Sequence, residues 1–200
     1  MSSCNVCSAE FDQPIYISGK ARSLTTMNTL IEGETQVYFC DGCGHAQTSA
    51  LPDLERFYAE EYDVYLYEED DDQLYMVDNG ERVYRSDHQA RVLSRKIDLS
   101  RFRRVLDYGC AKAPTLRKLC ADVPGIEPHM FDVTDKYIPF WEAFPEPRHY
   151  AAFKPDPTWQ GQIDVVLSFY ALEHIPDVKG MLDTVSALLV DGGDFYFIVP

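Results

Sequence analysis

Residues 163–176 read IDVVLSFYALEHIP, and this stretch does most to decide the fold. It opens with an aliphatic run at 163–168, which predicts a strand buried on both faces. Aromatic and polar residues follow, and then 177–190 places its apolar residues on one face of a predicted helix. A buried strand followed by an amphipathic helix is the repeating unit of a parallel α/β sheet.

The same alternation of strand and helix extends through residues 101–200. Apolar runs predict four further strands, at 104–107, 130–132, 149–153 and 195–199. A helix is expected around 115–121, and Asp191-Gly192-Gly193 is expected to end the helix at 177–190. We therefore predict that residues 101–200 form one α/β domain.

The amino-terminal 50 residues carry two C-x-x-C pairs, Cys4 with Cys7 and Cys40 with Cys43. Two such turns can present four thiolates to one ion and close its tetrahedron, as in structural zinc sites. We predict a zinc-ribbon module over residues 1–50, with short strands near 15–17 and 36–40. An iron site of the same geometry, two disulfides and free thiols remain the alternatives.

Three further residues, one histidine and two cysteines, are of types that can bind a metal but have simpler interpretations. His45 lies beside the second pair and could replace one ligand, although a solvated histidine is the simpler expectation. Cys110 and Cys120 lie in the α/β part, where we expect them to be small buried hydrophobic residues.

The charge balance limits the partners of the chain. Its 33 acidic and 18 basic residues give a formal net charge of −15. Such a charge repels phosphate backbones and anionic bilayers, so we expect neither a nucleic-acid nor a membrane partner. The first residues show no basic and apolar leader, and paired cysteines without a leader favour a metal in a reducing compartment. We therefore expect a cytoplasmic protein, with the oligomeric state left open.

Residues 51–100 are predicted to be a mainly helical connecting segment. A helix is expected from Leu51 to about Tyr67, acidic residues dominate 53–81, and basic residues dominate 82–104. The simplest interpretation of both charged runs is a pair of solvated faces. The segment also holds six tyrosines, which could bind a sugar or pack between domains: Tyr58, Tyr62, Tyr65, Tyr67, Tyr75 and Tyr84.

Residues 105–111, VLDYGCA, stand where the first strand of the α/β part gives way to the first helix. Open parallel sheets bind ligands beyond the carboxyl ends of their strands, and Gly109 would let the backbone approach a ligand there. Asp107 could face a positive or hydroxyl-bearing group. Asp132 ends the next strand and could accept hydrogen bonds from both hydroxyls of a ribose, the alternative being an exposed turn acid.

Four segments in order resemble the motifs of class I S-adenosylmethionine methyltransferases: residues 107–111, 131–133, 163–177 and 189–200. The resemblance implies a Rossmann-like parallel sheet and S-adenosylmethionine as cofactor. With a four-cysteine module in front, the chain further resembles deoxysugar C-methyltransferases, which act on nucleotide-linked keto sugars. The cofactor contacts implied are Asp107, Tyr108, Gly109, Cys110, Asp132, Ser168 and Phe169.

Two departures from the family pattern stand out. Ala111 occupies the position of the second motif glycine, and we expect it in the right-handed or extended region, since alanine avoids positive φ. The resembled sheet has seven strands, whereas the printed chain extends to the end of the fifth, so the closing strands are expected to be missing.

The resemblance also implies catalytic residues after the strand at 163–168. For methylation at carbon, His174 would remove a proton adjacent to a ketone, because imidazole titrates near neutrality. Glu173 would position the substrate or tune His174, and Tyr170 could bind the substrate or its enolate. Alternatively, Glu173 and His174 cap the next helix, or bind a divalent ion as in other methyltransferases.

We expect an S-adenosylmethionine-dependent methyltransferase that acts on a sugar or nucleotide-sugar, at carbon. The alternatives are an O- or N-methyltransferase and, in a different class, a non-catalytic zinc-ribbon module that binds a nucleotide.

Overall fold

The computed structural model describes residues 3–25, 29–49, 53–58 and 72–200. The chain divides into two compact units, which are described separately. One comprises Met1–Tyr62 with Ile175–Leu182, and the other comprises Asp63–His174 with Asp183–Pro200. The three-part division at residues 50 and 100 stays a prediction.

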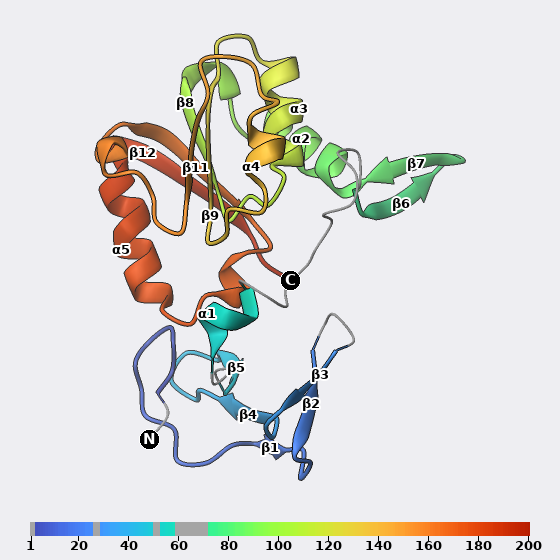
Figure 1. Cartoon of the computed structure of the whole chain (residues 1–200), viewed down its shortest axis with the longest axis vertical. Coiled ribbons are helices and arrows are strands. Elements are labelled where there is room, and N and C mark those ends of the chain that lie inside the picture. Colours follow the sequence, from blue (N-terminus) through green and yellow to red (C-terminus); the bar gives the residue numbers. More distant parts are fainter. Residues whose placement is uncertain (1–2, 26–28, 50–52, 59–71) are drawn as a thin grey trace. The chain divides into compact units, whose positions relative to one another are not determined.

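The amino-terminal unit consists of short antiparallel strands (Figure 1). One sheet has the order β1-β4-β5, and a separate hairpin pairs β2 with β3. The strand bounds are β1 Tyr16–Ile17, β2 Arg22–Leu24, β3 Leu30–Glu32, β4 Gln36–Phe39 and β5 Ala46–Thr48. The strands predicted near 15–17 and 36–40 are therefore present as β1 and β4.

A small core holds this unit together. Cys4, Cys40 and Phe11 are buried, and the ring of Phe11 stacks on Tyr38 with centroids 5.1 Å apart. So few apolar side chains supply little folding energy, and modules of this size commonly depend on a metal or disulfides.

Residues 53–100 include helices but also a hairpin that the sequence analysis missed. α1 spans Leu54–Arg56, and the rest of the helix predicted up to Tyr67 lies outside the described residues or is not α-helical. β6 (Leu74–Asp78) and β7 (Glu81–Tyr84) pair in an antiparallel hairpin. The correction has a local cause, because Asn79 and Gly80 both take positive φ, as a two-residue type I′ turn requires.

The hairpin leads directly into α2 (Arg85–Lys96), which carries much of the predicted basic run, and into a 3₁₀ turn at Leu99–Arg101. Of the six tyrosines, Tyr62, Tyr65 and Tyr67 lie outside the described residues, as does most of the acidic run.

A five-stranded parallel sheet forms the α/β part, with strand order β10-β9-β8-β11-β12. The strands are β8 Arg104–Tyr108, β9 Glu127–Asp132, β10 His149–Ala152, β11 Ile163–Phe169 and β12 Leu189–Ile198. The helices between them are α3 Pro114–Asp122, α4 Ile138–Trp141 and α5 Val178–Leu188, with 3₁₀ turns at Pro157–Trp159 and Leu172–His174. The Rossmann-like α/β fold is confirmed.

The order of the strands creates one switch point. The chain runs outward from β8 through β9 to β10 and then crosses back to place β11 on the other side of β8. Ligands of open α/β sheets bind at such a point, beyond the carboxyl ends of the strands.

The end of α5 differs from the expectation. The helix stops at Leu188, and β12 begins at the next residue, so the predicted turn at 191–193 lies inside the strand. The pairing of β11 with β12 shifts register between Ile163 and Val165, opposite these residues, and Gly192 has φ +76°. A bulge therefore absorbs the glycines that the sequence analysis placed in a helix-terminating turn.

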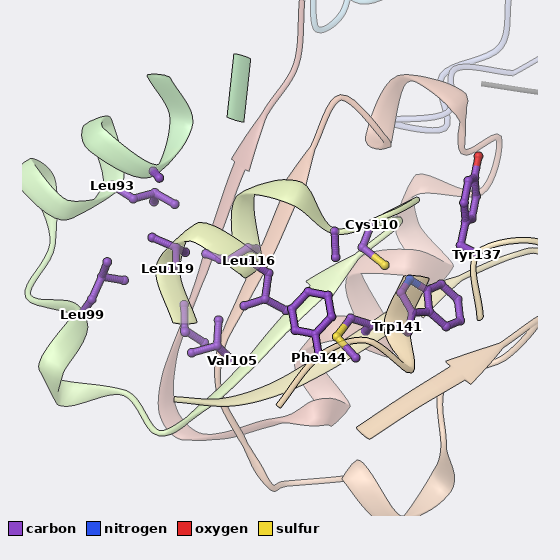
Figure 2. Packing of buried hydrophobic residues seen from close by; sticks show 14 residues of the cluster. Leu93, Leu99, Val105, Cys110, Leu116, Leu119, Tyr137, Trp141 and Phe144 are labelled. Atoms are coloured by element: carbon purple, nitrogen blue, oxygen red, sulfur yellow. The ribbon is translucent and has the colours of Figure 1, made fainter. Parts of the chain in front are cut away.

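One face of the sheet packs under α2, α3 and α4 (Figure 2). Leu116 and Leu119 of α3 and Trp141 of α4 are fully buried, and they contact the same cluster as Val105 of β8. Burial of each such aliphatic side chain contributes roughly 1.5–3 kcal/mol. This packing fixes α3 and α4 against the strand ends that precede them. Among the described residues, no helix is long and apolar enough to cross a bilayer.

Candidate cofactor site and cysteine cluster

The turn after β8 forms the centre of the candidate cofactor site. Gly109 has φ +74°, and a Cβ placed on it would lie 2.6 Å from the Cβ of Ala171. No larger residue fits, because both the backbone angle and the neighbour exclude it. The Gly109 and Cys110 amides donate to the Phe131 carbonyl, at 2.8 and 3.1 Å, and so tie this turn to β9.

Ala111 contradicts the sequence expectation, because its φ is +48° rather than negative. Two hydrogen bonds compensate for the strain of this left-handed conformation. The Ala111 amide donates to Oδ2 of Asp132 at 2.9 Å, and the Trp141 Nε1–H donates to the Ala111 carbonyl at 2.7 Å. Ala113 also has positive φ, +53°, at the helix cap of α3. The loop thus keeps the backbone shape that glycines would allow, with alanines held in place by their neighbours.

Asp132 ends β9 and is 9% exposed, so it is not the exposed turn acid of the alternative interpretation. Burial raises the pKa of its carboxyl group, while the amides of Ala111, Val133 and Thr134 lower it by hydrogen bonding. One carboxylate oxygen of Asp132 accepts the hydrogen bond from the Ala111 amide. Asp132 therefore faces the loop that would hold the ligand.

Asp107 lies near the carboxyl end of the adjacent strand, β8, and is 2% exposed. Burial, together with the nearby charge of Asp132, raises the pKa of Asp107 to about 8. Two buried acids at neighbouring strand ends repel each other, so a cationic ligand would relieve the cost of ionising them. This arrangement favours a ligand with both positive charge and hydroxyl groups.

The other cofactor residues predicted from the resemblance serve mainly to build the site. The ring of Tyr108 packs on Phe131 with centroids 4.7 Å apart, and Cys110 lies in the main core. The Ser168 hydroxyl is fully buried and donates to the Tyr108 carbonyl at 2.8 Å, which joins β11 to β8. Phe169 packs against the core cluster. Their direct contact with a cofactor stays a prediction.

The predicted catalytic residues follow β11 at the same edge of the sheet. Tyr170 has φ +54°, and its amide donates to the Ile198 carbonyl at 2.8 Å. Glu173 is exposed and His174 half-buried, in the 3₁₀ turn. Within the described part of the chain, the Glu173 carboxylate makes no hydrogen bond or ion pair, so the contact with His174 that would tune its basicity is not formed.

Sequence analysis did not single out Arg85, Ala113 or the role of Trp141 in the loop. The guanidinium carbon of Arg85 lies 4.4 Å from the centroid of the Tyr170 ring. The partners of Arg85 and Trp141 are distant in sequence and carry no local signal.

The four cysteines of the C-x-x-C pairs meet in one cluster, with all sulfur atoms within 4.8 Å of one another. The sulfurs of Cys4 and Cys43 are 3.6 Å apart, and those of Cys7 and Cys40 are 3.4 Å apart. Disulfide sulfurs would be about 2.05 Å apart. Sulfurs around one tetrahedral zinc, at Zn–S distances near 2.3 Å, would be about 3.8 Å apart.

The backbone also favours thiolates here. Burial opposes ionisation of Cys4, but hydrogen bonds from the amides of Cys7 and Val6 and from the thiols of Cys43 and Cys7 lower its pKa to about 7. Burial and the neighbouring cysteine side chains raise the pKa of Cys7 and raise that of Cys43 to about 12, so the four thiolates require a bound cation. His45 is not among the residues of the cluster. The four thiols therefore fit a closed zinc site.

The parallel sheet, its switch point and the glycine turn facing two strand-end acids define a Rossmann-like protein of the class I methyltransferase type. The family model described as "Methyltransferase domain" matches residues 78–200, more than half of the chain, and the chain belongs to this family. No curated protein sequence matches the chain.

Two solved structures are similar to parts of the chain, and the first of them shares its fold. A chain of the complex between the Haloferax volcanii Trm112 methyltransferase activator and a methyltransferase is 22% identical with a TM-score of 0.50, over 57% of this chain and 53% of that chain. A SAM-dependent methyltransferase from Aquifex aeolicus is 14% identical with a TM-score of 0.45, over 50% of this chain and 58% of that chain. The chain thus covers little more than half the length of either structure.

Proposed function

We propose that the protein transfers a methyl group from S-adenosylmethionine to a sugar or nucleotide-sugar, at carbon, and that its amino-terminal module holds one structural zinc. The observation that supports the cofactor best is the coupled arrangement of Gly109, Ala111 and Asp132. It brings a backbone turn that lacks a side chain at Gly109 together with a buried carboxylate at the switch point of the sheet. Family membership supports the reaction class.

The residues present fit this cofactor. Asp132 would accept hydrogen bonds from the ribose hydroxyls, and the backbone near Gly109 would pass along the amino-acid end. Asp107 would lie near the positive charge of that end. S-adenosylmethionine, when bound, supplies an electrophilic methyl group on a sulfonium ion.

For methylation at carbon, the protein's task is to generate and orient a nucleophile. His174 would remove the proton adjacent to the ketone at its imidazole nitrogen, Tyr170 would hydrogen-bond the enolate oxygen, and Glu173 would position substrate hydroxyls. The sugar substrate rests on the resemblance and on the tyrosine-rich segment before α2. Cytoplasmic location and the absence of nucleic-acid and membrane partners stay predictions.

Titration calorimetry with S-adenosylhomocysteine tests the cofactor site. Asp132→Ala should weaken binding about 10- to 100-fold, since it removes a charged acceptor worth roughly 1.5–3 kcal/mol. Asp135→Ala provides a matched control, because Asp135 is an exposed acid in the same loop. Equal affinities of both variants and wild type would show that the ribose binds elsewhere.

Deuterium exchange at the substrate carbon tests the chemistry, with a panel of nucleotide-linked keto sugars. His174→Asn should abolish exchange while S-adenosylhomocysteine still binds, whereas Glu173→Gln should retain exchange. The reversed pattern would exchange the two roles. No exchange in wild type, with methyl transfer present, would indicate O- or N-methylation; cofactor binding without transfer to any sugar would favour the non-catalytic module.

A further inference from the structure

Arg85 places a positive charge at the edge of the sheet where the predicted catalytic residues lie. It is the first residue of α2, and its guanidinium lies over the ring of Tyr170. Tyr170 directly follows β11 and is held by its amide hydrogen bond to Ile198. Arg85 and Tyr170 are therefore close together beside the switch point, although they are 85 positions apart and nothing in their local sequence pairs them.

Among the described residues, the guanidinium of Arg85 has no polar partner. In the part of the chain that the structure describes, it forms neither an ion pair nor a hydrogen bond. Several other basic side chains, by contrast, have acidic partners: Arg103 and Arg104 with Glu127, Lys118 with Asp87, and Arg148 with Glu146. In a chain with 33 acidic and 18 basic residues, an unneutralised and half-buried arginine stands out.

The contact with the Tyr170 ring uses none of the Arg85 donors in a hydrogen bond. A guanidinium carries five N–H donors, and within the described residues those of Arg85 remain available to a ligand. The ring also limits the number of orientations that the side chain can take. An arginine held in this way is suited to two parallel hydrogen bonds with a phosphate or carboxylate.

The sheet order places Arg85 on the side of the site away from Asp132. β11 and β9 lie on opposite sides of β8, roughly 10 Å apart at a strand spacing near 4.8 Å. If Asp132 marks the ribose, Tyr170 and Arg85 lie on the other side of β8, where the proposal places the methyl acceptor. His88 follows three residues after Arg85 on α2 and stacks on Tyr75, with ring centroids 4.1 Å apart. Residues three apart share a helix face, so His88, whose ring stacks on Tyr75, lies next to Arg85 on α2.

We propose that Arg85, supported by the ring of Tyr170, binds an anionic group of the methyl acceptor and so selects acceptors that carry a phosphate or carboxylate. The proposal rests on the proposed methyltransferase function. The strong negative net charge would otherwise repel such acceptors, and one guanidinium with available donors supplies a local attraction.

Inorganic pyrophosphate and malonate serve as probes of the two anion types. Each is titrated calorimetrically into the full chain, with and without saturating S-adenosylhomocysteine. Wild type should bind at least one probe, and the one that binds identifies the anion type. Arg85→Gln should weaken that binding about tenfold or more, the usual effect of losing a charge-assisted hydrogen-bond pair. Arg91→Gln, which removes the same charge from an exposed site on α2, should change it less than about twofold.

Several results would overturn the assignment. Arg85 does not bind an anion if wild type binds neither probe, or if Arg85→Gln and Arg91→Gln weaken probe binding equally. A loss of S-adenosylhomocysteine affinity in Arg85→Gln would instead assign Arg85 to the carboxylate of the cofactor. Should Arg85→Gln fail to fold by circular dichroism, Arg85→Lys is used, and it should bind more weakly than wild type because lysine lacks the fork. Failure of wild type to bind S-adenosylhomocysteine, with probe binding intact, would count against the proposed function alone.

Discussion

Replacement of Asp107 by asparagine should change how the stability of the α/β part depends on pH. Burial and the charge of Asp132 raise the pKa of Asp107 to about 8, whereas an unfolded aspartate titrates near 3.9. The folded protein therefore keeps a proton that the unfolded chain releases. The free energy of unfolding must fall as pH rises from about 4 to about 8, and the stability contribution is fully present only below pH 4.

The magnitude follows from the size of the window. Between pH 5 and pH 7 the unfolded carboxyl is ionised and the folded one stays mostly protonated, so each pH unit costs roughly 1.4 kcal/mol. Wild type should thus lose about 2–3 kcal/mol over these two units through Asp107 alone. Asp107→Asn keeps the shape of the side chain and cannot ionise, so it should lack this loss.

Guanidinium chloride unfolding at pH 5, 6 and 7, followed by tryptophan fluorescence, measures the effect. Both tryptophans of the chain, Trp141 and Trp159, lie in the unit that holds Asp107, so the signal reports on that unit. Asp122→Asn removes an exposed acid at the end of α3 and should keep the wild-type slope. Parallel slopes for wild type and Asp107→Asn would refute the buried, protonated aspartate.

Four further outcomes are expected. The affinity for S-adenosylhomocysteine, measured calorimetrically, should fall by up to about tenfold per pH unit below pH 8, because the ligand's ammonium group requires ionised Asp107; a flat profile would separate Asp107 from the ligand. Gly109→Ala should lower the free energy of unfolding by about 1–3 kcal/mol, since its Cβ would collide with Ala171 at positive φ; an unchanged denaturation midpoint would contradict the geometry. Trp141→Phe should cost about 1 kcal/mol or more through the lost bond to Ala111, and wild-type stability would show that the loop does not depend on it. Elemental analysis should find about one zinc per chain and markedly less in Cys7→Ser, whereas a metal-free wild type with four free thiols would end the zinc assignment.

Local patterns were sufficient wherever the required signal lies within one segment. The aliphatic run at 163–168 and the strand before Asp107 were predicted because buried parallel strands need continuous apolar residues. The hairpin at 74–84 was missed although Asn79 and Gly80 carry its turn signal, because the acidic and basic runs around it fit solvated faces of a mainly helical segment equally well.

The conformation of Ala111 could not be read from its own identity. Alanine by itself avoids positive φ, and only the carboxylate of Asp132 and the indole of Trp141, both distant in sequence, hold it there. The raised pKa of Asp107 likewise depends on its burial in the middle of the sheet, between β9 and β11, and on the nearby charge of Asp132, which local sequence does not specify.

The sequence by itself determined the five strands of the parallel sheet, the two cysteine pairs and the identity of the acids at the strand ends. Periodicity and spacing are properties of consecutive residues, so these features needed no third dimension. Only the tertiary structure decided that the four sulfurs gather within one cluster, that Gly109 abuts Ala171, and that the guanidinium of Arg85 lies over the ring of Tyr170. Such contacts join residues far apart in the chain, and their geometry follows from the packing of whole elements rather than from any local preference.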